Sequence, residues 1–187
     1  MGKVIYIEKF NKIGGMDMTN NDIEKLAMNI LDLNGFNTVV VDPVKLANAY
    51  GIEVKNARFA DGDISGMLRK ENDKIIIYVN SSESIMRKRF TVAHELGHYF
   101  LNHLEKNDKT IHRKTDFFSN VTPKESDANA FAAAILMDQY KVKELYDKLH
   151  YIGVPLDKII SKLSSTFRVS RPAVNIRLKK LGLIDDK

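Results

Sequence analysis

The sequence contains no cysteine, and this absence narrows the kinds of site that its 187 residues can build. Disulfide bonds and thiolate-ligated zinc are both excluded. No apolar run approaches the ~20 residues that a membrane-spanning helix requires. The first residues interleave lysine and glutamate with apolar side chains and lack the apolar core of a secretory signal. We therefore expect a cytoplasmic protein that makes no contact with a membrane.

The remaining composition is ordinary for a globular protein, with 44% hydrophobic and 28% charged residues. The length suits one domain with a small appendage and is sufficient for a hydrophobic core. A total of 29 lysines and arginines against 24 acidic residues gives a net charge of +5. This mild excess indicates little about binding partners.

The most informative stretch is an apolar segment that contains His-Glu-x-x-His, formed by His94, Glu95 and His98. On a helix, residues four apart lie about 40° apart around the axis and roughly 6 Å apart along it. Both imidazoles can therefore point at one ion, and Zn²⁺ accepts nitrogen ligands at about 2.0–2.1 Å. Glu95 lies beside them, where its carboxylate can take a proton from the attacking water. We expect Ser82 to cap this helix, which would run through residue 103.

A catalytic zinc site needs a third protein ligand and an open position. His103 is a poor candidate because, five residues after His98, it points about 140° away around the helix. Glu125 is a better one, since it begins a second predicted helix whose small residues allow close packing on the first. Asp127 is a rival ligand on another face of that helix. Glu125 has the alternative role of a capping carboxylate.

The start of this second helix has a clear sequence signal. Thr122 is the expected N-cap, Pro123 occupies the first turn, and Glu125 stands at the capping-box position. Asn129 follows one turn later on the same face as Glu125. We expect its amide to orient one of the ligand imidazoles.

Two segments of the chain carry a family resemblance. They are the run from Arg89 to His98 and the pattern Glu125-x-x-Ala128-Asn129-x-Phe131-Ala132. Together they resemble the ImmA/IrrE family of metallopeptidases over roughly residues 21–140. The chain departs from the family pattern at Asp138, where a proline often follows Leu-Met.

The resemblance implies a gluzincin-like zinc site with His94, His98 and Glu125 as ligands and Glu95 as the catalytic base. Manganese stays open as the working metal. Family members of the ImmA type are associated with cleaving a helix-turn-helix repressor that silences a mobile element or a stress response. The resemblance therefore implies a zinc-dependent endopeptidase whose substrate is such a repressor.

We accordingly expect an α+β fold with a zincin-like metallopeptidase domain over residues 21–150. In this domain a small three-stranded sheet packs on the helices that carry His-Glu-x-x-His and the third-ligand glutamate. The predicted strands are 52–54, 64–68 and 74–79. Residues 1–20 would form an N-terminal arm or an extra strand. Residues 151–187 would form a helical, helix-turn-helix-like appendage.

The surroundings of the predicted site are less well determined by the sequence. The strand at 74–79 is the expected edge for an extended substrate, and a buried sheet strand is the alternative. Residues 104–121 are polar and are expected to form a loop beside the site. His112, Tyr99 and Tyr140 are candidate stabilisers of the oxyanion.

The C-terminal segment has a residue pattern typical of a helix-turn-helix, with Ser170 as the cap of its second helix. Arg168 stands at the turn position where glycine is usual. Between residues 158 and 184 there are seven lysines and arginines and no acidic residue, which suits contact with DNA phosphates. The candidate DNA or partner contacts are Arg171, Asn175, Arg177, Lys179 and Lys180, with Arg171 and Asn175 as base readers. The alternatives are a packing element for the peptidase or a dock for the repressor.

Two other classes of function remain open at this point. One is a metal-containing DNA-binding regulator, in which the metal site acts only as a sensor. The other is a non-catalytic partner that sequesters a repressor or a toxin.

Overall fold

The computed structural model describes residues 18–104, 110–114 and 122–185. Within these ranges seven helices and four strands form an α+β fold. In chain order they are α2 (Asn20–Leu33), α3 (Pro43–Ala49), β1 (Glu53–Ala57), β2 (Ile64–Glu71), β3 (Lys74–Asn80), α4 (Ile85–Phe100), β4 (Thr110–Lys114), α5 (Pro123–Leu136), α6 (Gln139–Tyr151), α7 (Leu156–Phe167) and α8 (Arg171–Lys180). The predicted N-terminal arm lies almost entirely outside the described residues.

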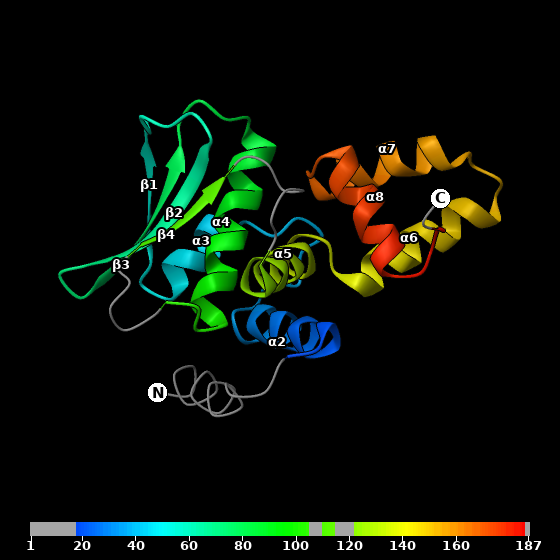
Figure 1. The fold of residues 1–187 in the computed structure, drawn as a ribbon. Helices are drawn as coiled ribbons and strands as arrows, with labels where there is room; N and C mark the ends of the chain where they lie inside the picture. Colours follow the sequence, from blue (N-terminus) through cyan, green and yellow to red (C-terminus); the bar gives the residue numbers. More distant parts are fainter. Residues whose placement is uncertain (1–17, 105–109, 115–121, 186–187) are drawn as a thin grey trace.

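The sheet lies on one side of α4, and α5 and α2 follow on the other side (Figure 1). Helices α6, α7 and α8 group together at the end of the molecule away from the sheet. Helix α4 is therefore the central element between the sheet and the remaining helices. None of the helices in the described ranges is long and apolar enough to cross a membrane.

The sheet has the strand order β1-β3-β2-β4. Strand β1 runs parallel to β3, whereas β2 is antiparallel to both β3 and β4. Asn72 and Asp73 make the turn between β2 and β3, with φ values of 46° and 65°. The three predicted strands are thus confirmed.

Two predictions about the sheet are wrong. The strand at 74–79 is not an edge, because β3 pairs with β1 on one side and with β2 on the other. The segment 104–121 is not wholly a loop, because Thr110–Lys114 forms β4 and adds a fourth strand at the edge. This strand is polar, so its pairing with β2 left no hydrophobic pattern in the sequence.

Helix α4 begins and ends inside the predicted limits. Ser84 is its N-cap, and its Oγ accepts a hydrogen bond from the Arg87 amide at 3.3 Å. Ser82, the predicted cap, instead donates from its Oγ to the side-chain oxygen of Asn80. The helix ends at Phe100, and Asn102 takes a left-handed conformation with φ 56° that turns the chain.

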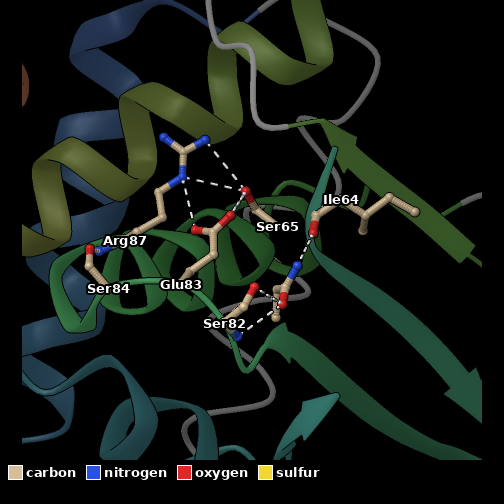
Figure 2. A network of polar contacts seen from close by, with 7 residues as sticks. Ile64, Ser65, Ser82, Glu83, Ser84 and Arg87 are labelled. Carbon is tan, nitrogen blue, oxygen red and sulfur yellow. Dashed lines mark hydrogen bonds and ion pairs between the residues drawn. The ribbon is translucent and has the colours of Figure 1, made fainter. Parts of the chain in front are cut away.

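A polar network holds the start of α4 against β2 (Figure 2). Ser65 is fully buried and donates to the Glu83 carboxylate at 2.7 Å. The guanidinium of Arg87 lies 3.4 Å from the Ser65 hydroxyl and 3.3 Å from Glu83. One turn further along α4, Gly66 of β2 packs against Thr91, and a Cβ at Gly66 would lie 2.5 Å from the Thr91 methyl group. The metal-site helix is therefore fixed to the sheet along its first half.

The C-terminal helices α7 and α8 form the predicted helix-turn-helix-like pair. Arg168 takes the left-handed conformation at the turn, with φ 54°, although glycine is usual there. Ser170 caps α8 by accepting a hydrogen bond from the Ala173 amide. Val174 and Leu178 of α8 are buried.

Candidate metal centre

Helix α4 brings two histidine side chains together inside the protein. His94 and His98 are both buried, and their Nε2 atoms lie 2.9 Å apart. Two nitrogen ligands of one tetrahedral zinc ion lie about 3.3 Å apart, as follows from zinc–nitrogen bonds of about 2.0–2.1 Å. The helical spacing therefore produces the convergence that the sequence predicts.

Helix α5 supplies the carboxylate that completes the cluster. Thr122 caps the helix and accepts a hydrogen bond from the Glu125 amide at 3.3 Å. The Glu125 carboxylate turns toward the imidazoles, with oxygens 3.1 Å from Nε2 of His94 and 3.2 Å from Nε2 of His98. One ligand atom from each of the three residues lies within 4.8 Å of the others. Asp127, the rival candidate, does not belong to this cluster.

The two helices can approach this closely because Gly97 faces α5. A Cβ at Gly97 would lie 2.9 Å from Cα and 3.0 Å from the carbonyl oxygen of Ala128. Real Cβ contacts are essentially never that short. The absence of a side chain at Gly97 thus sets the distance from which Glu125 reaches across to α4.

The electrostatics of the cluster suit a cation. Burial alone would raise the pKa of the Glu125 carboxyl, but hydrogen bonds and charge interactions with His94 and His98 outweigh it. The pKa of Glu125 therefore lies below its ordinary value, and the group is an anion at neutral pH. An ionised carboxylate beside two imidazole nitrogens is a donor set that zinc prefers.

Each imidazole is also held through its Nδ1 atom, the ring nitrogen that does not face Glu125. Nδ1 of His94 lies 2.9 Å from the side-chain oxygen of Asn129, in the position expected from the sequence. Nδ1 of His98 lies 3.0 Å from Nδ1 of His103. Such contacts fix the tautomer and the direction of a metal-binding histidine. The residues present therefore fit a divalent cation bound by two Nε2 atoms and one carboxylate.

His103 is the participant that sequence reasoning missed. If the helix continued, His103 would point away from His98. Helix α4 ends at Phe100, however, and the left-handed conformation of Asn102 turns the chain back so that His103 faces His98. Burial, and then the proximity of His98 and Lys124, lower the pKa of His103 to about 4, so that its ring is neutral at neutral pH. The Leu-Asn pair at the helix end was the available signal, since asparagine tolerates the left-handed conformation.

Glu95 follows His94 directly on α4 and is fully buried. The candidate oxyanion stabilisers Tyr99 and Tyr140 lie on α4 and α6, and their role stays a prediction. Tyr99 packs edge-on against Phe100 with ring centres 5.1 Å apart, and Tyr140 is 70% exposed at the start of α6. The third candidate, His112, is placed on β4 opposite Met67, and its side chain lies outside the described residues.

The predicted DNA contact of Arg177 is wrong. This side chain is only 4% exposed, and its guanidinium donates to the Met137 carbonyl at 3.0 and 2.8 Å and forms an ion pair with Glu24. Arg171 lies on the surface but is paired with Asp157. The remaining candidates, Asn175, Lys179 and Lys180, lie along α8 and are partly or fully exposed.

Two histidines four residues apart on a buried helix, an adjacent glutamate and a third ligand from a second helix define a metallopeptidase of the His-Glu-x-x-His type. The chain matches the sequence model described as the IrrE N-terminal-like domain over residues 47–179, and it belongs to this family of metallopeptidases. It is 26% identical over 129 residues to the metallopeptidase ImmA of Bacillus subtilis (strain 168), which covers 67% of this chain and 69% of that protein. The family predicted from the two motifs is confirmed.

Proposed function

We propose that this metallopeptidase is a zinc-dependent endopeptidase that cleaves a peptide bond within a protein substrate. The observation that carries the proposal is the convergence of His94, His98 and Glu125, with carboxylate–imidazole distances of 3.1 and 3.2 Å. Family membership supports a protein as the substrate. Zinc is the preferred ion for this donor set, with manganese as the alternative.

Each residue of the centre has a role in this proposal. A zinc ion held there would polarise the scissile carbonyl and make a water molecule acidic near neutral pH. Glu95 would accept the proton of the attacking water and pass it to the leaving amine. Asn129 and His103 would keep the imidazoles of His94 and His98 in the required orientation.

The substrate chain needs an exposed strand edge, and β3 is not one. We assign this role to β4, which pairs with β2 alone among the described strands. Gly66 of β2 contacts α4 through Thr91 and is paired with Arg113 of β4. Strand β2 therefore contacts α4, and β4 lies directly beside it at the edge of the sheet. An extended peptide can add to such an edge through backbone hydrogen bonds.

The proposed substrate is a helix-turn-helix repressor of a mobile element or a stress response, as the resemblance to ImmA-type proteins suggests. A repressor substrate would also account for the predicted cytoplasmic location. The DNA-binding alternative has less support, because Arg177 is buried and Arg171 is already paired with Asp157.

The test is to incubate the zinc-loaded protein with the repressor encoded beside its gene and to detect fragments by mass spectrometry. We expect the wild type to cleave at one site and the Glu95→Gln variant to lose cleavage by more than about a hundredfold, because the general base is absent. The variant should keep its fold and its zinc content. Retained cleavage by Glu95→Gln would contradict the role of Glu95.

A further inference from the structure

A groove of about 860 Å³ lies between α8 and the paired helices α4 and α5. Its apolar lining comes from all three helices and includes Met86, Phe90, Ala130, Ala133, Pro172 and Ile176. The volume falls within the range of about 300–1,000 Å³ typical of specific ligand sites. Met86 and Ile176 are 42% and 43% exposed, so large apolar side chains from opposite walls remain accessible to an occupant.

The groove lies beside the metal centre, although none of its lining residues is His94, Glu95, His98 or Glu125. Asn129 lines it and also contacts Nδ1 of His94 at 2.9 Å. Phe90 lines it one helical turn before His94, with the two ring centres 6.4 Å apart. Ser126, the neighbour of Glu125, lines it as well. The groove therefore comes within one helical turn of His94 on α4 and of Glu125 on α5, on the side from which Asn129 contacts His94.

The α8 wall of the groove is held rigidly. Arg177 ties α8 to the end of α5 through the Met137 carbonyl and to α2 through the ion pair with Glu24. Arg89 of α4 adds a hydrogen bond to the Arg168 carbonyl at 3.3 Å. These contacts join α8 and the turn before it to α2, α4 and α5 within the protein itself. The groove therefore exists before any ligand binds. A preformed site loses less conformational entropy on binding.

We propose that this groove binds apolar side chains of the substrate segment next to the scissile bond, and that Ile176 of α8 determines specificity there. The proposal rests on the proposed peptidase function. It commits to an apolar stretch of the protein substrate as the occupant, because the groove has a mainly apolar lining and lies beside the centre where the proposed function would cut that chain. Helix α8 is then a wall of the substrate site.

The first arm of the test measures binding without catalysis. The zinc-loaded Glu95→Gln protein is used to select sequences from a library of short randomised peptides. We expect the selected peptides to carry closely spaced large apolar residues, and to bind about tenfold more weakly when Ile176→Asp is added, because an apolar side chain then meets a charge. Leu156→Asp is the matched control, since Leu156 is also 43% exposed, lies on α7 and does not line the groove.

The second arm measures cleavage of the same library by proteins that retain Glu95. The wild type should favour large apolar residues on one side of the cleaved bond, and Ile176→Asp should remove this preference. Ala133→Leu, which narrows the groove from the α5 wall, should shift the preference to smaller side chains. Circular dichroism and thermal unfolding establish that the variants fold.

The outcomes separate the two proposals. Selection of apolar peptides that depends on Ile176, without cleavage by any protein, would support the groove and contradict the peptidase function. Cleavage whose preferences are the same in Ile176→Asp and wild type would support the peptidase function and overturn the groove assignment. Peptide selection that is unchanged in Ile176→Asp would also overturn the groove assignment. So would a wild-type dimer that dissociates in Ile176→Asp, because the groove would then bind a second copy of the chain.

Discussion

Glu125 shows how a single side chain acquires its role from its neighbours. In another context it would be a capping carboxylate, because it stands three residues after the N-cap Thr122. The imidazoles of His94 and His98 lower its pKa despite its burial, so the carboxylate is ionised and directed at the point where both Nε2 atoms meet. The sequence allowed both roles, and only the position of α5 against α4 distinguishes them.

Removal of this carboxylate should weaken metal binding. We expect Glu125→Ala to lower the affinity for zinc by more than about a hundredfold, because one of three protein ligands is lost. Competition with a chromophoric chelator measures the affinity. Asp127→Ala, which removes the rival carboxylate on the same helix, is the control and should bind zinc as the wild type does. If Asp127→Ala were the weaker binder of the two, the third ligand would be reassigned.

At the scale of elements, the distance between α4 and α5 determines whether the centre can form. Gly97 lies against the backbone of Ala128, so the helices touch where the ligands face one another. Helical periodicity in the sequence was sufficient to predict these helices and the face that carries each ligand. It did not identify Ala128 as the backbone that approaches Gly97, because such a contact involves two segments far apart in the chain.

A methyl group at Gly97 should separate the two helices. We expect Gly97→Ala to reduce the free energy of unfolding by about 1–3 kcal/mol through overpacking, despite the better helix propensity of alanine. Zinc affinity should fall as well, since Glu125 would move away from the imidazoles. Urea unfolding and metal titration test both effects. Gly62→Ala is the control because a Cβ there meets nothing within 4 Å, and comparable losses in both variants would disprove this account.

The sequence predicted the elements that have apolar periodicity and missed features that depend on pairing. Strand β4 was taken for a loop because it is polar, and its partner β2 lies more than thirty residues earlier in the chain. Strand β3 was assigned to an edge because strand order does not follow from the order in the sequence. His103 was rejected as the third ligand, and it does not belong to the cluster. Its contact with His98 was not predicted, because the left-handed turn at Asn102 ends the helical geometry.

At the scale of the whole molecule, the C-terminal helices are joined to the helices around the metal centre by buried contacts. The buried guanidinium of Arg177 joins α8 to the end of α5 and to α2, whose Glu24 lies 153 positions earlier in the chain. The family match over residues 47–179 likewise extends past the domain boundary predicted at residue 150. We propose that the predicted boundary separates two parts that function together.

Loss of the Arg177 contacts should destabilise the whole protein. We expect Arg177→Ala to reduce the free energy of unfolding by about 3–5 kcal/mol, because it leaves Glu24 and the Met137 carbonyl without this buried partner. Arg171 lies on α8 as Arg177 does, and Arg171→Ala removes an exposed ion pair with Asp157 of α7. This variant should lower the free energy of unfolding by only about 0–1 kcal/mol. Urea unfolding compares the two variants. Equal losses would show that the buried pair has no special role in joining the helices.

The central claim is that His94, His98 and Glu125 bind one divalent cation. X-ray absorption spectroscopy of the zinc-loaded protein tests it most directly, with the Glu125→Ala variant measured beside it. The account predicts one zinc per chain with two imidazole nitrogens at about 2.0–2.1 Å and a carboxylate oxygen that is lost in the variant. A zinc environment without histidine, or an identical spectrum for both proteins, would contradict it.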